Sequence, residues 1–206
     1  MKKLSAALLV ATTIAVAGCN TQTEQAEPSP EAETETEIIA VSDQPGPAIG
    51  DRAPVDLELA NAAGNKASVA SLADEKGTIL VFTRSVDWCP FCQAQLKGLK
   101  DIAEDVANSG YTLAGVSYDP VSSLAAFAGD QDIPYTLLSD DGSKLIDAFA
   151  IRDPQYADPE SRAYGVPYAS IFILDADGVV RAKSVSADYK VRPTNDEVLQ
   201  LIESVG

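Results

Sequence analysis

The stretch ILVFTRSVDWCPFC, Ile79 to Cys92, holds two of the three cysteines in this 206-residue chain. It begins inside a continuous apolar run, 78–83, which is typical of a buried central strand. It ends at the start of a segment, 90–108, whose apolar residues recur at helical spacing. We therefore expect Cys89 and Cys92 just past the carboxyl end of a buried strand, in the first turn of a helix.

That position favours redox chemistry at the cysteine pair. The free N–H groups and partial positive charge of a helix N-terminus favour thiolate over thiol, so Cys89 is predicted to be the more reactive sulfur. The spacing to Cys92 puts both sulfurs on one helix face, close enough to bridge. Pro90 suits a first helical turn, because its missing N–H would be unpaired there anyway. Trp88 and Phe91 supply an apolar rim for a docking polypeptide.

A metal site is the weaker interpretation of the pair. Structural zinc takes four Cys or His ligands, whereas this chain has three cysteines and no histidine. The third cysteine, Cys19, lies in an N-terminal segment that indicates a different role. We expect neither a metal nor another cofactor.

The N-terminal segment indicates export. Lys2 and Lys3 precede an uncharged run, 4–17, that is too short to span a bilayer as a helix. The run ends in VAGC, Val16 to Cys19, which resembles the lipobox of bacterial lipoproteins. The resemblance implies cleavage before Cys19 and lipid on its thiol, and so a protein anchored to the cell envelope. With Asn20 next, it implies the outer membrane, on the periplasmic side, in a Gram-negative cell. An ordinary secretory signal is the alternative.

Residues 19–47 are predicted to be an acidic, disordered tether. Seven acidic residues and no Lys or Arg lie between Asn20 and Pro47, and few apolar residues are present to offset chain entropy. The whole chain has 15 basic and 31 acidic residues, a net charge of −16. Removal of residues 1–18 takes away two lysines and makes the charge more negative. Such a polyanion is not attracted to nucleic acid or to anionic lipid, so the lipid on Cys19 must hold it to the membrane.

The remaining residues, 48–206, fit one α/β domain. A strand, a helix and a strand in that order predict a parallel βαβ unit, whose site lies at the carboxyl edge of the sheet. Asp177-Gly178 predicts a hairpin, and Thr194 with Glu197 forms a capping box for the last helix. The predicted strands are 55–59, 78–83, 111–118, 135–140 and the two arms of 169–185; the predicted helices are 71–74, 90–108, 122–129, 143–151 and 194–205.

These features together resemble the thioredoxin superfamily, with Trp-Cys-Pro-Phe-Cys as the redox motif. IGDRAPVDLELANAAGNKASVASL, from Ile49, and YGVPYASIFILDADGVV, from Tyr164, are similar to segments of redoxin (AhpC/TSA-like) domains. The resemblance covers about 49–206 and implies a central mixed sheet with flanking helices. It also implies that Val166 and Pro167 lie at the substrate face, with Pro167 as a cis-proline opposite the cysteines. The alternative is an ordinary trans proline that starts an edge strand.

Two branches of the superfamily compete. In peroxiredoxins the peroxide-reacting cysteine ends a Pro-x-x-x-Thr-x-x-Cys pattern. Placing Cys92 at its end puts Ser85 at the proline and Cys89 at the threonine. The chain thus resembles a peroxiredoxin-like branch that carries a thioredoxin-style Cys pair. Thioredoxins have a buried aspartate six residues before the first cysteine, and that position is Thr83 here, so another group must handle the proton at the second cysteine.

Three further features allow two interpretations each. Arg84 is either a group that stabilises a thiolate or peroxide oxygen, or a surface arginine at a strand end, which we favour. The polar loop 151–165 is either a plain insertion or a lid that carries the three side chains Tyr156, Arg162 and Tyr164. Tyr189, Lys190 and Arg192 are interpreted as solvated surface rather than as a basic patch near the last helix.

We therefore expect a membrane-anchored thiol–disulfide oxidoreductase that acts on protein or small-molecule disulfides. Cys89 would attack as thiolate, and Cys92 would resolve the mixed disulfide, leaving a Cys89–Cys92 bond. One alternative is a thiol peroxidase in which either cysteine attacks a hydroperoxide. Another is a non-enzymatic thioredoxin-fold binding module whose Cys pair is a stable staple. The missing proline and threonine favour disulfide exchange, because a thiol without peroxide-orienting groups lacks transition-state stabilisation.

Overall fold

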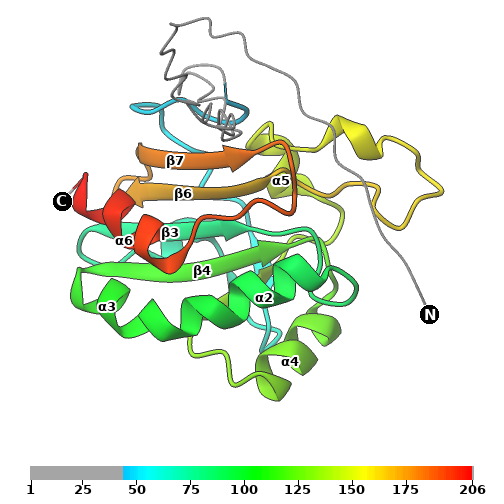
Figure 1. Cartoon of the computed structure of the whole chain (residues 1–206), viewed down its shortest axis with the longest axis horizontal. Helices are drawn as coiled ribbons and strands as arrows, with labels where there is room; N and C mark the ends of the chain where they lie inside the picture. Colours follow the sequence, from blue (N-terminus) through cyan, green and yellow to red (C-terminus); the bar gives the residue numbers. More distant parts are fainter. Residues whose placement is uncertain (1–43, 206) are drawn as a thin grey trace, which may run out of the picture. The chain divides into compact units, whose positions relative to one another are not determined.

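A seven-stranded mixed sheet organises residues 44–205, the part of the chain that the computed structural model describes (Figure 1). The predicted signal, Cys19 and most of the predicted tether lie outside these residues. In spatial order the strands are β2 (Lys66–Ala67), β1 (Leu59–Asn61), β5 (Thr136–Ser139), β4 (Tyr111–Ser117), β3 (Gly77–Phe82), β6 (Ala169–Asp175) and β7 (Val180–Ser186).

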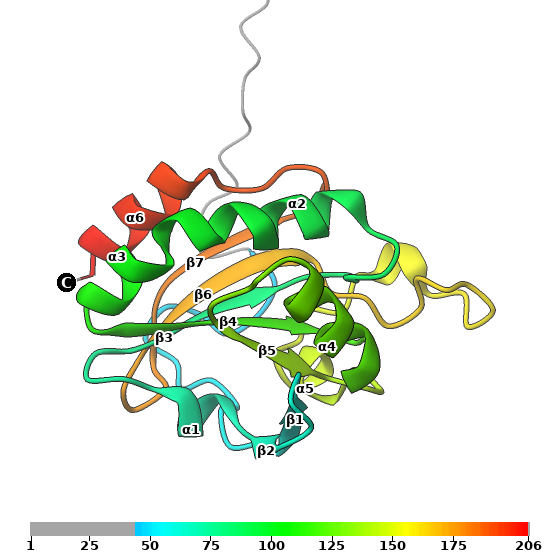
Figure 2. The ribbon, with the colours of Figure 1, turned by 90° about the horizontal axis from the view of Figure 1, so that it is seen from below.

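Helices cover both faces of the sheet (Figure 2). Core contacts place α2, α3, α4 and α6 on one face and α1 and α5 on the other. No helix among the described residues is long and apolar enough to cross a bilayer. The helical elements are α1 (Val69–Leu72), α2 (Pro90–Gly98), η2 (Leu99–Ile102), α3 (Ala103–Asn108), α4 (Val121–Asp130), α5 (Lys144–Ala148), η3 (Pro154–Tyr156) and α6 (Asn195–Glu203).

Strand β3 is buried on both faces, which explains its unbroken apolar sequence. Ile79 faces the helices α3 and α6, whereas Leu80 and Phe82 face the opposite core. On that side the ring of Phe82 lies 4.9 Å from that of Phe149 and 6.0 Å from that of Phe172. The sequence prediction of a central strand is confirmed here.

The strand register brings distant segments to one edge of the sheet. Strand β3 pairs in parallel with β4 and antiparallel with β6, so Phe82 lies opposite both Val116 and Ser170. Strand β7 returns along β6, and its last residue, Ser186, pairs with Ala169. The end of β3, the end of β4, the approach to β6 and the exit from β7 therefore meet at the edge where α2 begins. The predicted βαβ unit and hairpin are confirmed.

Two predicted elements differ from the structure. The strand predicted over 55–59 is a turn followed by irregular chain, and the paired strand begins only at Leu59. The chain bends here because Val55 is buried in the core, whereas Ala60 pairs with Ser139 of β5. The helix predicted over 90–108 is interrupted by the 3₁₀ turn Leu99–Ile102. Gly98, a weak helix former, immediately precedes that change of pitch.

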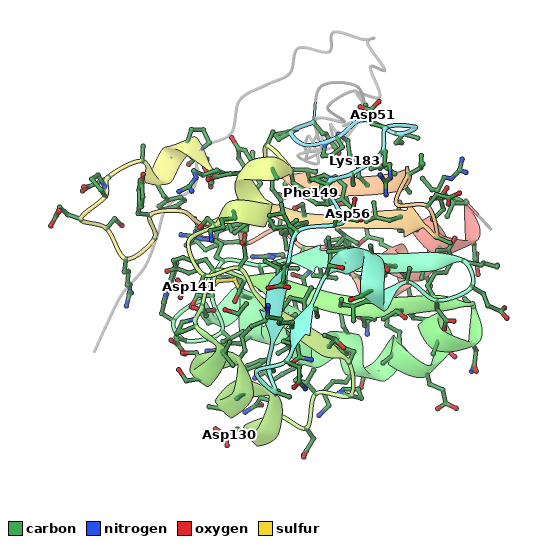
Figure 3. The ribbon with its side chains drawn as sticks, turned by 180° about the vertical axis from the view of Figure 1, so that it is seen from behind. Asp51, Asp56, Asp130, Asp141, Phe149 and Lys183 are labelled. Atoms are coloured by element: carbon green, nitrogen blue, oxygen red, sulfur yellow. A yellow bond between two sulfur atoms is a disulfide. The ribbon has the colours of Figure 1, made fainter. Side chains whose placement is uncertain are left out.

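Residues 44–47, which the sequence assigns to the tether, lie against the domain. The Lys183 ammonium lies 3.0–3.3 Å from the four backbone carbonyl oxygens of this segment and is 7 % exposed. Figure 3 labels Lys183 near Asp51, beside the segment that enters the domain. Gly46 has φ +88° and approaches the core so closely that a Cβ would lie 2.8 Å from Phe172. The domain therefore begins before Ala48.

Candidate active site

Cys89 and Cys92 form a disulfide at the start of α2, with their Cα atoms 5.2 Å apart. Cys89 is the N-cap of the helix, and its sulfur accepts a hydrogen bond from the backbone N–H of Cys92 at 3.4 Å. Pro90 occupies the first helical position, as predicted. The two cysteines are 1 % and 0 % exposed, so exposure does not distinguish Cys89 as the more accessible sulfur.

A buried carboxylate organises the turn that leads to the pair. Asp119, just past the end of β4, accepts hydrogen bonds from the Ser85 hydroxyl at 2.8 Å and the Val86 N–H at 2.6 Å. Its second oxygen also accepts one from the Ser117 hydroxyl at 2.8 Å. Burial raises the pKa of Asp119, and these three donors oppose that shift. Ser85 occupies the position of the proline in the peroxiredoxin motif, and a hydrogen bond to a side chain 34 residues away thus fixes its place.

Arg192 reaches the redox pair from the segment between β7 and α6. Its Nη2 lies 3.3 Å from Sγ of Cys92, and its Nη1 donates to Oε1 of Gln95 at 2.8 Å. Its Nε donates to the carbonyl of Tyr189 at 2.8 Å. Burial, followed by the nearby charge of Arg84, lowers the pKa of Arg192 to about 10, so the group stays cationic at neutral pH. The interpretation of Arg192 as solvated surface was wrong.

Arg84 is also buried, at 3 % exposure, which corrects the surface interpretation. Its guanidinium carbon lies 4.1 Å from the ring centres of both Tyr156 and Tyr189. The Trp88 ring centre is 5.1 Å away. Within the described residues its Nε has no hydrogen-bond acceptor. Aromatic faces rather than carboxylates therefore surround this charge.

The loop 151–165 contacts the site through two of its three predicted residues. Tyr156 packs on Arg84, and the guanidinium of Arg162 lies 5.1 Å from the Trp88 ring centre. The Tyr118 hydroxyl also connects the loop to the redox turn, because it accepts a hydrogen bond from Trp88 Nε1 at 3.0 Å and donates one to the carbonyl of Arg162. These contacts favour the lid over a plain insertion.

The third residue of that loop, Tyr164, and one residue of the predicted apolar rim, Phe91, lie further out. Tyr164 is 46 % exposed and packs on Arg152 instead. Phe91 is 39 % exposed and meets the ring of Tyr189 edge to face at 5.7 Å. Phe91 is thus exposed, and its role in a docking rim stays a prediction.

The other predicted residues are buried at the same edge of the sheet. Val166 and Pro167 precede β6, and Pro167 forms an isolated bridge with Arg152. The placement of Pro167 opposite the cysteines as a cis residue stays a prediction. Thr83 is 1 % exposed, and its hydroxyl has no hydrogen-bond partner among the described residues. No cluster of His, Cys, Asp or Glu in residues 44–205 could hold a metal ion.

Sequence reasoning missed the contributions of Tyr118, Asp119, Tyr189 and Arg192. Asp119 and Tyr118 follow the second parallel strand, so the edge rule already used for the cysteines would have placed them near the site. Tyr189 and Arg192 follow the predicted hairpin, whose antiparallel return brings the chain back to the same edge. Topology was the available signal, since neither residue belongs to a local motif.

The AhpC/TSA family model matches residues 49–183, about two thirds of the chain. The chain belongs to the AhpC/TSA family. A putative peroxiredoxin of Mycobacterium tuberculosis is 31% identical over 150 residues, which cover 70% of this chain and 87% of that protein. Peroxiredoxin Bcp of Escherichia coli is 27% identical over 158 residues, 75% of this chain and 94% of the relative. The match to chloroplastic peroxiredoxin Q of Suaeda salsa, 29% identical, covers 66% of this chain and only 60% of that protein.

Solved structures of peroxiredoxin-type proteins share the fold. Peroxidoxin BcpB of Mycobacterium tuberculosis superposes with a TM-score of 0.62 at 21% identity, covering 76% of this chain and 95% of the other. A peroxiredoxin-like protein from Aquifex aeolicus gives a TM-score of 0.66 at 21% identity, with coverage of 78% and 89%. The thioredoxin-like α/β fold predicted from the sequence is therefore confirmed.

Proposed function

We propose that this member of the AhpC/TSA family is a thiol peroxidase in which Cys92 attacks a hydroperoxide and Cys89 resolves the product. The contact of Arg192 with Sγ of Cys92, at 3.3 Å, is the observation that carries this assignment. A guanidinium at that distance stabilises a thiolate and the negative charge that develops on peroxide oxygen. The peroxiredoxin relatives favour this reaction over the disulfide exchange that the sequence motif suggested.

The proposed reaction has three steps. The Cys92 thiolate attacks one oxygen of the hydroperoxide and the O–O bond breaks. The departing alkoxide takes one proton from solvent and leaves as an alcohol, while Cys92 keeps the transferred oxygen as a sulfenic acid. The Cys89 thiol then attacks the Cys92 sulfur and releases water, which gives the Cys89–Cys92 disulfide. An external dithiol supplies two electrons and two protons to restore both thiols. The Cys89–Cys92 disulfide in this structure supports the proposal, because the resolving step would form the same bond.

Two features of the site substitute for the missing motif residues in this proposal. Arg192 supplies the charge, and the Asp119–Ser85 hydrogen bond fixes the turn where a proline stands in the motif. Cys89, at the position of the motif threonine, supplies the resolving sulfur. A single helical turn therefore holds both the attacking and the resolving groups.

Serine variants test the assignment. In a Cys19→Ser background, which removes the remote thiol, we expect Cys92→Ser to abolish hydrogen peroxide turnover with dithiothreitol. Cys89→Ser should still consume one peroxide per chain and form a sulfenic acid, which a dimedone adduct detects by mass spectrometry. If Cys92→Ser retains the wild-type rate and Cys89→Ser loses it, the roles of the two sulfurs are reversed. If both variants turn over hydrogen peroxide at the same rate as the protein that keeps both cysteines, the peroxidase proposal is wrong.

Disulfide exchange through Cys89 remains a second candidate function. The position of Cys89 at the N-cap, next to the exposed Phe91 rim, favours attack on a protein disulfide. In that case Cys92→Ser should trap a mixed disulfide on Cys89 with an oxidised protein substrate such as insulin, and peroxide consumption should be slow.

A further inference from the structure

The surroundings of Arg84 connect three segments that enclose the redox pair. The side chain comes from the residue after Thr83 at the end of β3, and its guanidinium carbon lies 4.1 Å from the centres of two rings. One ring, that of Tyr156, belongs to the loop before β6, and the other, that of Tyr189, to the segment after β7. Trp88, 5.1 Å away, belongs to the redox turn itself. One guanidinium thus lies among all three segments.

Tyr189 connects Arg84 to the cysteines through Arg192. The carbonyl of Tyr189 accepts from Nε of Arg192 at 2.8 Å, and Nη2 of Arg192 lies 3.3 Å from Sγ of Cys92. The ring of Tyr189 also meets Phe91, which lies between the two cysteines. A shift of Tyr189 away from Arg84 would therefore move the group that contacts Cys92.

The two guanidinium groups are near one another without a compensating carboxylate. Within residues 44–205, neither Arg84 nor Arg192 forms an ion pair. The positive charge of Arg84 helps to lower the pKa of Arg192; Arg84 is buried and Arg192 is partly buried. Reduction of the disulfide by two electrons and one proton breaks the S–S bond and leaves one thiol and one thiolate. A thiolate on Cys92 would supply the negative charge that this pair lacks.

We propose that Arg84, held in a sandwich between the rings of Tyr156 and Tyr189, is a positioning residue that keeps Arg192 in contact with Cys92, and that the two guanidinium groups favour the reduced, thiolate form of the pair. The inference rests on the proposed function only in taking Cys92 as the thiolate. It predicts that removing Arg84 makes the Cys89–Cys92 disulfide harder to reduce and Cys92 less ionised. Both quantities are measurable without peroxide, so they do not depend on the outcome of the peroxidase assay.

The main variant is Arg84→Met, which keeps the length of the side chain and removes its charge. Equilibration with dithiothreitol redox buffer, in the Cys19→Ser background, should show at least a tenfold shift toward the disulfide, about 30 mV. In the Cys19→Ser/Cys89→Ser background, titration of the thiolate absorbance at 240 nm should show a severalfold smaller thiolate fraction at pH 7. Arg52→Met, at an exposed arginine, is the control and should change neither value.

Arg84→Lys separates charge from stacking. It retains a cation but not the planar group that two rings enclose, so it should recover less than half of either shift. If lysine restores both values fully, charge alone acts and the positioning role is wrong. Unchanged equilibrium and titration in folded Arg84→Met would overturn the whole inference.

A second pair of variants serves if Arg84→Met does not fold. Tyr156→Leu removes one face of the sandwich, whereas Tyr156→Phe keeps the ring and is its matched control. Tyr156→Leu should shift the equilibrium with dithiothreitol at least threefold toward the disulfide, and Tyr156→Phe should not. Equal values for the two variants would contradict the sandwich.

Discussion

Nη2 of Arg192 lies 3.3 Å from Sγ of Cys92 although 100 residues separate them along the chain. The contact exists because strand β7 runs antiparallel to β6 and returns the chain to the edge where α2 begins (Figures 1 and 2). A residue outside the cysteine motif thus contacts one of its two sulfurs.

Arg192→Met should slow peroxide reduction. Loss of the guanidinium that contacts Cys92 removes charge stabilisation of the thiolate and of the leaving oxygen, and we expect kcat/KM for hydrogen peroxide to fall by roughly 10- to 100-fold. Stopped-flow consumption of peroxide measures this, with Arg52→Met as the exposed control. A change of less than twofold would exclude Arg192 from the reaction.

Asp119→Asn should destabilise the domain in a pH-dependent way. Asparagine offers one acceptor oxygen where three donors now converge, so we expect a loss of about 1–3 kcal/mol in the free energy of unfolding. Burial raises the pKa of Asp119 in the folded state above its value in the unfolded chain. The contribution of Asp119 to folding stability is therefore complete below its pKa in the unfolded chain, and it declines as the pH rises through its pKa in the folded protein. Urea unfolding between pH 3.5 and 7 should show the wild-type advantage shrinking; an advantage that grows with pH would contradict the raised pKa.

Lys183→Met should loosen the start of the domain. The ammonium is hydrogen-bonded to the carbonyls of residues 44–47, and its loss should cost about 1.5–3 kcal/mol of unfolding free energy. Limited proteolysis should also cut near residue 47 more rapidly. Lys144→Met, at an exposed lysine, is the matched control and should change neither measurement.

Two glycines should respond oppositely to alanine. Gly77 has φ +133°, and a Cβ there would lie 2.0 Å from the carbonyl oxygen of Leu174, so Gly77→Ala should lower the melting temperature strongly. Gly129 lies in helix α4 with nothing within 4 Å of a Cβ, so Gly129→Ala should stabilise by about 0.5–1 kcal/mol. Thermal unfolding by circular dichroism compares them; equal effects would mean that the close approach at Gly77 can relax.

The proposed lipid anchor rests on the sequence alone and has its own test. Mass spectrometry of protein purified from bacterial membranes should show a mature chain that starts at Cys19 and carries acyl groups. We expect Cys19→Ala to release the protein from the membrane fraction. A mature N-terminus elsewhere, or an unmodified Cys19, would contradict the lipoprotein prediction.

The sequence was sufficient for the parts of the fold that local patterns determine. The apolar run at 78–83, the hairpin at Asp177-Gly178 and the capping box of Thr194 each specify their structure within a few residues, and all three are confirmed. The Cys89–Cys92 bridge follows from helical spacing in the same way. In contrast, the shift of the first strand to Leu59 depends on pairing with β5, far along the chain.

The charged part of the site was not predictable from local patterns. Arginine is usually exposed, so a solvated position was the sound expectation for Arg84 and Arg192. Arg84 is enclosed by Tyr156 and Tyr189, which come from different segments and meet only in the folded chain. Arg192 is held by the Tyr189 carbonyl and by Gln95. A prediction would have needed the strand order, which places those segments at one edge.

The segment that leads into the domain also protects the sheet. Asp51 accepts from the N–H of Val180, the first residue of β7, and Gly50 donates to the Val180 carbonyl, so the start of this outer strand is already paired. At the opposite side, β2 is only two residues long and carries the charged Lys66. Short, charged or covered outer strands offer few free groups to a second chain. The domain is therefore built to resist edge-to-edge aggregation, even where many copies are crowded together.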